Sequence, residues 1–332
     1  MPWRKVLRRP NRWIAKDTML TFIALVLVFA NVINLPQQGQ LDVEPETTQQ
    51  VFSDYNNVPR KEITFEDIQF LRFLDSGAGK LGFKAKIRGR RTLFAAKIAG
   101  DRHLTDTEAQ MMQILNTPPT IPNIPKVELY IPSIPNPFTN RTYFEKTLRL
   151  PRHLSEWLAS LDTISVMVME YLYIDTVHFL PRTFKEVRVF LRSLLQALQF
   201  AHSRNVMNRD LYLGNVYFDG TVVKLFDWDD GAIYKPNAVK IRVSRTRLKN
   251  PPEGWNNASA LHPTISGYDV WNVGIIMRKL WPSVETPNDE KQVLLLKDFV
   301  EAALTEDPYK RPDASELLRH PFLADKTQEI AI

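Results

Sequence analysis

The chain of 332 residues has no cysteine, which excludes disulfide bonds and every form of thiol chemistry. It also has no internal repeat, which excludes solenoid and propeller architectures. Its hydrophobic content is ordinary for a globular protein, and its length allows either one large two-lobed domain or two small ones.

The net positive charge of the chain is concentrated in its first residues. Of the formal net charge of +6, six cations and one aspartate lie before residue 18, so the rest of the chain carries only about +1. The basic character of the chain is thus that of an N-terminal cluster, and it gives no reason to infer nucleic-acid binding by the rest of the chain. We therefore expect no nucleic-acid partner.

Charge is absent altogether from residues 18–41, where 18–35 are rich in Leu, Val, Ile and Phe. That run is close to the minimum length for spanning a bilayer. Cations precede it and acidic residues follow it, so the positive-inside rule leaves residues 1–17 in the cytosol. We predict an uncleaved signal anchor at 18–35 and a type II single-pass protein with its domain lumenal or extracellular. The alternatives are a secreted protein with a cleaved signal peptide and a mitochondrial protein with a presequence.

The remaining sequence predicts an α+β protein whose strands come first and whose helices come later. Residues 36–62 are rich in glutamine and read as a flexible stalk. Short apolar runs broken by glycine between 68 and 98 favour an antiparallel sheet, and 106–115 have helical spacing. Seven prolines in 117–138 leave only KVELYI as a strand there. Residues 184–203 predict an amphipathic helix that begins with a capping box of Thr183 and Glu186.

Two polar stretches flank a predicted hairpin in the second half of the chain. Asp219-Gly220 joins two apolar runs and can supply the positive φ angles of a tight turn. Asn215 precedes the first strand and Asp227 follows the second, so both side chains should emerge at the same end of the ribbon, near Asp210. Carboxylate and amide oxygens are suitable ligands for a hard cation. The pattern predicts a magnesium site beside a general base.

These stretches resemble the catalytic motifs of protein kinases. Asn208-Arg209-Asp210-Leu211 through Asn215 is similar to the catalytic loop H-R-D-L-x-x-x-N, and Asp227-Trp228-Asp229 to D-F-G. The resemblance implies that Asp210 accepts the proton of a substrate hydroxyl. It also implies that Asn215 and Asp227 bind Mg²⁺ on ATP.

The first lobe carries further motifs of the same family. Residues 77–82 have the spacing G-x-G-x-x-G between two predicted strands, which favours a kinase phosphate loop over a dinucleotide fold. Lys97 would bind the phosphates and pair with Glu108 on the next helix, although Asp106 is also near. In the stretch that resembles the hinge, Glu170 and Leu172 are expected to bind the nucleotide. The expected nucleotide-binding residues are Gly77, Ala78, Gly79, Lys80, Gly82, Lys97, Glu170 and Leu172.

The resemblance implies a two-lobed α+β kinase fold preceded by a single transmembrane helix. We expect an N-lobe at 63–173 with a proline-rich insertion at 117–160, and a C-lobe at 174–325. The activity implied is transfer of phosphate from ATP to Ser or Thr of a protein substrate.

Within the family, the sequence around residues 170–211 is similar to the catalytic subunit of casein kinase II, which also has tryptophan after the metal-binding aspartate. Five cations between Lys240 and Lys249 resemble its basic loop. They predict a preference for acidic or already phosphorylated substrates, although a solvated basic loop is the simpler interpretation.

Four departures from the family pattern weaken the case for full activity. Asn208 replaces a histidine that is structural in the family, and Tyr212 replaces a lysine that neutralises the transferred phosphoryl group. Asp229 replaces a glycine, and Lys84 stands where an apolar residue should cover adenine. Two alternatives therefore stay open, a pseudokinase scaffold that binds nucleotide with little turnover and a kinase for a non-protein acceptor such as a glycan.

Overall fold

The computed structural model describes residues 63–77, 79–100, 102–138, 141–173, 179–234, 251–252 and 267–324. The predicted cytosolic segment, signal anchor and stalk at 1–17, 18–35 and 36–62 lie outside these residues, as does the basic loop at 240–249. Within the described part of the chain, every helix is too short or too polar to cross a membrane.

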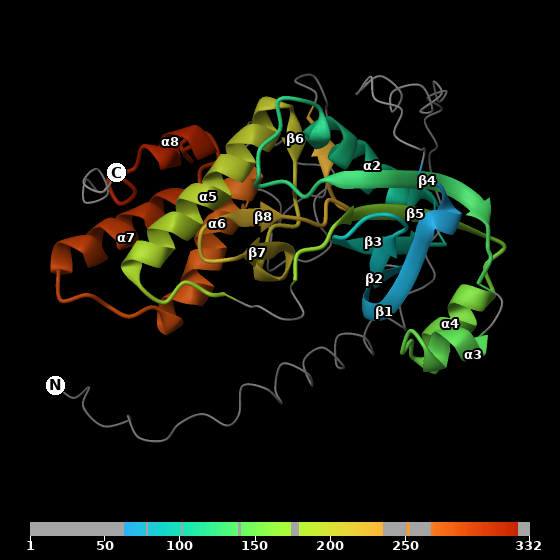
Figure 1. The fold of residues 1–332 in the computed structure, drawn as a ribbon. Helices are drawn as coiled ribbons and strands as arrows, with labels where there is room; N and C mark the ends of the chain where they lie inside the picture. The colour runs from blue at the N-terminus through green and yellow to red at the C-terminus, as the bar shows by residue number, and fades with distance from the viewer. Residues whose placement is uncertain are drawn as a thin grey trace. The chain divides into compact units, whose positions relative to one another are not determined.

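Five antiparallel strands form the sheet of the N-terminal lobe, in the order β1-β2-β3-β5-β4 (Figure 1). In β2, Leu81, Phe83 and Ala85 are buried on one face, and Gly82 and Lys84 belong to the other, as the period of two requires. The strands are β1 (Ile68–Gly77), β2 (Lys80–Ile87), β3 (Leu93–Ala99), β4 (Val127–Pro135) and β5 (Thr163–Glu170), preceded by the short helix η1 (Phe65–Asp67).

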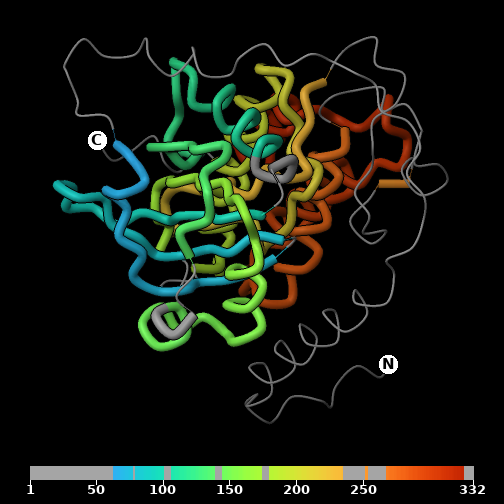
Figure 2. Tube along the Cα trace, turned by 90° about the vertical axis from the view of Figure 1, so that its right-hand side faces the viewer, coloured from blue at the N-terminus to red at the C-terminus, as the bar shows by residue number. Residues whose placement is uncertain are grey.

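Both faces of this sheet are covered, which explains why β5 is buried at residues 164–169 without alternation. On one face, Met167 and Met169 pack with Ala109 of helix α2 (Arg102–Asn116). The other face packs against helices α3 (Arg141–Lys146) and α4 (Arg152–Ala159) and the segments beside them. The two views show α2 and the α3–α4 pair on opposite sides of the sheet (Figures 1 and 2).

The proline-rich region differs from the prediction. The sequence indicated one insertion at 117–160 with a strand only at KVELYI, whereas β4 extends to Pro135 and pairs with Thr163 of β5. Prolines are tolerated in β4 because it is an edge strand, where one side of the ladder needs no partner. The segment added to the sheet is therefore 136–162, and aromatic residues anchor it. The rings of Phe138 and Phe144 meet edge to face at 4.9 Å.

A second core unites the helical lobe around α5 (Phe184–Ser203), which has the predicted bounds. The predicted capping box is also confirmed, because Thr183 accepts from the N–H of Glu186 and the Glu186 carboxylate accepts from the N–H of Thr183. Met112 and Leu115 of α2 belong to this core, so α2 links the sheet to the helical lobe. The remaining elements are β6 (Val206–Met207), η2 (Leu213–Asn215), β7 (Val216–Phe218), β8 (Val223–Leu225), β9 (Ala232–Ile233), α6 (Gly267–Leu280), η5 (Trp281–Ser283), α7 (Glu290–Ala303) and α8 (Ala314–Leu318).

Candidate active site

The predicted hairpin carries the two polar stretches to one place. Strands β7 and β8 are antiparallel, with Val216 opposite Leu225. Their connection has four residues, 219–222, where the sequence indicated Asp219-Gly220, and within it the Asp219 carboxylate accepts from the N–H groups of Thr221 and Val222. Gly220 has the expected positive φ of 99°. Asn215 and the segment beginning at Phe226 therefore meet, and the N–H of Phe226 donates to the Asn215 carbonyl at 3.2 Å.

Asn208 connects the catalytic loop to the segment of Asp227. Its amide oxygen accepts from the N–H of Asp210 at 3.2 Å, and its amide nitrogen donates to the Asp227 carbonyl at 3.4 Å. The side chain is fully buried, so these bonds are shielded from water. Asn208 thus joins the backbone of the catalytic loop to that of Asp227, a structural role of the kind expected for the residue that it replaces.

A buried aspartate of α6, Asp269, accepts hydrogen bonds from the backbone of the same loop. The Asp269 carboxylate accepts from the N–H groups of Asn208 at 2.9 Å and Arg209 at 2.8 Å, and it contacts His202 Nε2 at 2.9 Å. Arg209 and Asp227 both adopt positive φ, of 62° in each case. Non-glycine residues keep such a conformation only where their surroundings fix it, which is common at functional sites.

Asp210 and Asn215 lie against each other at the mouth of the hairpin. Asn215 Nδ2 donates to the Asp210 carbonyl at 3.0 Å and to Asp210 Oδ2 at 3.2 Å. These bonds fix the orientation of both side chains and turn the Asn215 amide oxygen away from Asp210. The Asp227 carboxylate and this amide oxygen are hard donors of the type that Mg²⁺ prefers, so the residues fit the metal that the family motif implies.

Lys97 and Glu108 form the expected ion pair between β3 and α2. Lys97 Nζ lies 2.6 Å from Glu108 Oε1 and 3.1 Å from Asp227 Oδ1, and Glu108 is fully buried. Burial alone would lower the pKa of Lys97, but the carboxylates of Glu108, Asp227 and Asp229 outweigh it and raise that pKa. The competing residue, Asp106, points elsewhere and accepts a hydrogen bond from Tyr130.

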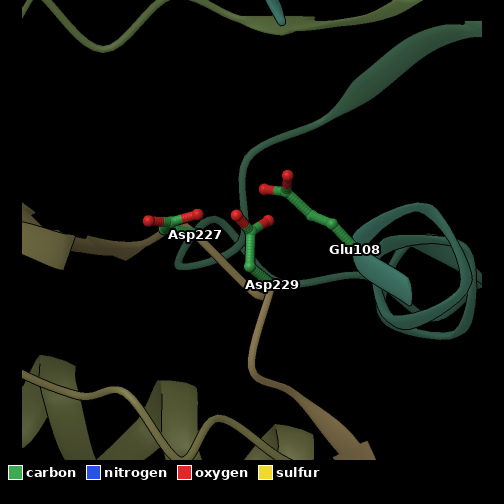
Figure 3. Close-up of side chains that lie close together, drawn as sticks. All are labelled: Glu108, Asp227 and Asp229. Carbon is green, nitrogen blue, oxygen red and sulfur yellow. The ribbon is translucent and has the colours of Figure 1, made fainter. Parts of the chain in front are cut away.

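Two further charges join this pair, and the sequence had not predicted their contacts. Lys80 Nζ lies 3.1 Å from Glu108 Oε2 and also contacts the Asp229 carboxylate. Figure 3 shows Glu108 of α2 converging with Asp227 and Asp229, and oxygen atoms of the three carboxylates lie within 4.8 Å of one another. Lysines from both β2 and β3 therefore contact this group of carboxylates.

The pKa shifts in this cluster follow from burial and charge. Burial opposes ionisation of Glu108, but Lys97 and Lys80 overcome it and lower its pKa to about 2. Burial and the neighbouring Glu108 carboxylate raise the pKa of Asp229 to about 8. The ammonium groups of Lys97 and Lys80 both contact the Glu108 carboxylate, and Lys97 also contacts Asp227.

The glycine-rich turn lies at the end of the β1–β2 ribbon. Gly77 pairs with Lys80, and Gly79 lies in the turn between them, whereas the predicted nucleotide-binding residue Ala78 is outside the described residues. Gly79 has φ of 74°, which a side chain would disfavour. The space beside Gly77 is open, because a Cβ built there would meet no atom within 4 Å. Gly82 faces Lys97 in the β2–β3 register.

Tyr212 takes the place of the family's catalytic-loop lysine. Burial and the carboxylates of Asp210 and Asp227 raise the pKa of Tyr212 to about 12, so the phenol stays neutral at physiological pH. The ring lies against the backbone of Gly214, where a Cβ would come within 2.4 Å of a ring carbon. The loop thus has an aromatic hydroxyl where the family has a cation.

At the end of β5, the two predicted hinge residues, Glu170 and Leu172, differ from each other in their surroundings. The Glu170 carboxylate accepts from Lys224 at 2.8 Å, and its N–H donates to the Lys126 carbonyl at 2.8 Å, so Glu170 fastens β5 to its neighbours. The Leu172 side chain is buried. Between them, the Tyr171 ring lies 4.6 Å from Lys84 Nζ in a cation–π contact. Lys84 thus reaches from β2 to the segment after β5 that the sequence predicts to be the hinge.

We expect Lys84→Val to tighten nucleotide binding about threefold to thirtyfold, because the substitution removes both the charge and the contact with Tyr171 from the expected base site. The dissociation constant of ADP, measured by calorimetry, checks this. Lys86→Val, at an exposed position on the same face of β2, is the matched control. An unchanged or weaker affinity in Lys84→Val would contradict the placement of Lys84 over the base.

Comparison with known proteins agrees with this geometry. A model of the protein kinase domain matches residues 152–323, which is just over half of the 332-residue chain. The chain belongs to the protein kinase family. The matched range contains Asp210, Asn215 and Asp227, whereas Lys97 and Glu108 precede it, and the α+β fold with its N-terminal β-sheet is consistent with the assignment.

Several curated proteins are similar over this region. Serine/threonine-protein kinase pak-1 of Caenorhabditis elegans is 32% identical over 157 residues, covering 40% of this chain and 26% of that protein. Serine/threonine-protein kinase dst2 of Dictyostelium discoideum is 26% identical over 175 residues, covering 46% and 15%. Serine/threonine-protein kinase 10 of Homo sapiens is 27% identical over 177 residues, covering 44% and 18%. The chain thus spans about a quarter or less of the length of these relatives.

Proposed function

We propose that this chain is an ATP-dependent protein kinase that transfers phosphate to serine or threonine of protein substrates. The proposal rests on one observation. Lys97 forms ion pairs with both Glu108 and Asp227, and in the catalytic loop Asn215 donates a hydrogen bond to Asp210. These five side chains come from four separate segments, and their contacts support a role in phosphoryl transfer. The names of the relatives support serine and threonine as acceptors.

Each residue has a role that its surroundings support. Asp210, oriented by Asn215, would accept the proton of the acceptor hydroxyl. Lys97, charged because Glu108 and Asp227 flank it, would bind the phosphates of ATP. Asn215 and Asp227 would hold magnesium, which when bound spreads the charge of the phosphates. Asn208 and Asp269 keep the loop that carries Asp210 in position.

Transfer of labelled phosphate from Mg-ATP tests the proposal. The full chain is incubated with peptide libraries in which serine, threonine or tyrosine is the only acceptor. We expect label on serine and threonine peptides and much less on tyrosine peptides. Label confined to tyrosine, or to a glycan acceptor in a parallel reaction, would contradict the proposed substrate class.

A second candidate is a scaffold that binds nucleotide with slow turnover. The observation that favours it is Tyr212, a neutral side chain where the family has a lysine. We expect Tyr212→Lys to raise kcat about tenfold or more, because a cation at this position stabilises charge that develops on the transferred group. Tyr212→Met, of similar length and neutral, is the matched control. Equal rates in the two variants would show that the missing cation does not limit turnover.

We further propose that substrates are acidic or already phosphorylated, the preference expected from the basic loop predicted at 240–249. The support is five cations between Lys240 and Lys249, in a chain whose net charge after residue 17 is only about +1 with these cations included. A peptide array tests this, because the proposal predicts that acidic residues after the acceptor raise the rate. Preference for basic residues would contradict it.

Membrane anchoring through residues 18–35 is a separate proposal. It rests on the uncharged run and on the asymmetry of charge around it. Protease added to sealed vesicles should leave the kinase domain intact if it is lumenal. Digestion without detergent would contradict the proposed orientation.

A further inference from the structure

Lys80 is the least expected charged residue in the candidate active site. Its side chain is only 6% exposed, although it lies one residue after the glycine-rich turn. Lysine loses hydration and conformational freedom when buried, so such a position needs compensating contacts. The compensation is specific, with Glu108 at 3.1 Å and Asp229 in contact.

The strand register places Lys80 on the nucleotide-facing side of the sheet. Gly82 faces Lys97 across the β2–β3 ladder, and Lys80 is two residues from Gly82 on the same face. Both ammonium groups bond the same carboxylate, Lys97 at Oε1 of Glu108 and Lys80 at Oε2. Two cations thus stand side by side under the glycine-rich turn, an arrangement suited to an anion with charge on successive phosphates.

The catalytic loop lacks a lysine near its base. In residues 208–216 the only cation is Arg209, which donates to the Asp230 carbonyl, and Tyr212 is neutral. Compared with the family pattern, the chain therefore lacks one cation in the catalytic loop and has an additional one, Lys80, in β2. Asp229, which contacts Lys80, stands where the family motif has glycine.

We infer that Lys80 is a second phosphate-binding cation that replaces the lysine missing at position 212, and that Asp229 positions its ammonium group. This inference rests on the proposed function, since it assigns Lys80 to the ATP used there. It explains why two departures from the family pattern, Tyr212 and Asp229, occur together. A lysine that extends from β2 to the phosphates needs a hydrogen-bond acceptor that fixes its ammonium group, and a glycine at 229 has no side chain to provide one.

Nucleotide binding by the full chain tests the inference without requiring turnover. We expect Lys80→Met to weaken Mg-ATP about tenfold to a hundredfold, the usual effect of losing a charge-assisted bond, and to leave AMP unchanged. Lys86→Met is the matched control, being exposed on the same strand face, and should bind both nucleotides normally. Thermal melting of each variant reports folding. Equal weakening of ATP and AMP, or no weakening, would overturn the inference.

Two double variants separate phosphate binding from simple neutralisation of Asp229. If Lys80 only neutralises Asp229, the variant Lys80→Met with Asp229→Gly should bind ATP normally, and that result would overturn the inference. We expect it to stay weak. In a Tyr212→Lys background, the loss of kcat caused by Lys80→Met should shrink severalfold, because the new lysine would take over the role of Lys80. This double-mutant cycle measures whether the two cations share one role.

The positioning role of Asp229 is tested separately, by two substitutions at this residue. Asp229→Asn keeps an oxygen for Lys80 and should bind ATP nearly as the native chain does, whereas Asp229→Gly should weaken ATP and leave AMP unchanged. Identical behaviour of the two variants would remove the positioning role. A native chain that binds no Mg-ATP would contradict the proposed function itself, whereas ATP binding that is indifferent to Lys80 would overturn this inference alone.

Discussion

Asp210→Asn is expected to lower kcat by about two to four orders of magnitude, the contribution of a positioned general base. The amide keeps the shape of the side chain and can still contact Asn215, so the backbone of the loop should be unaffected. Mg-ATP affinity should change little, because Lys97 and Asp227, which would bind phosphate and metal, are intact. Single-turnover phosphate transfer, with calorimetry for ATP, measures both quantities.

The control for Asp210→Asn is Asp230→Asn, which makes the same charge change at an exposed position in the following segment. It should keep kcat within about twofold. If Asp210→Asn also kept native kcat, Asp210 could not be the base. A fall in ATP affinity equal to the fall in kcat would instead assign Asp210 to binding.

Asp269→Ala is expected to lower the free energy of unfolding by about 2 to 5 kcal/mol. The carboxylate is fully buried and accepts from two backbone N–H groups, at Asn208 and Arg209, which would lose their partner. His202 would also lose its contact at Nε2, and its Nδ1 already has no partner within the described part of the chain. Urea unfolding followed by tryptophan fluorescence measures the change.

A matched substitution is Asp298→Ala, which removes a carboxylate that contacts a histidine, His320, but is 70% exposed. Surface pairs of this kind contribute little, so the expected change is within about 0.5 kcal/mol. Equal effects of the two substitutions would show that Asp269 does not brace the catalytic loop.

The sequence predicted the parts of the site that depend on local pattern. The turn at Gly220 and the spacing of Asn215 and Asp227 around it follow from strand periodicity and turn chemistry. The bounds of α5 follow from its apolar stripe and from the Thr183 capping box. The sequence also predicted Glu108 as the partner of Lys97, because residues 106–115 have helical spacing after the strand of Lys97, and the ion pair confirms it.

Features that depend on contacts between residues far apart in the chain could not be predicted from local sequence pattern. Lys80 and Asp229 are 149 residues apart, and no local pattern pairs a buried lysine with an aspartate at a glycine position. The extension of β4 through two prolines depends on its place at the sheet edge, which strand order alone determines. The contact between Lys84 and Tyr171 likewise needs the register of β2 beside the end of β5.

The central claim is that these residues form a working magnesium-nucleotide site, and Asp227→Asn tests it most directly. Transfer of labelled phosphate to a serine peptide is measured for the full native chain and this variant across a magnesium titration. We predict magnesium-dependent transfer by the native chain and a rate lower by about a hundredfold or more in Asp227→Asn. Equal transfer by the two chains, or transfer by the native chain that does not depend on magnesium, would contradict the account.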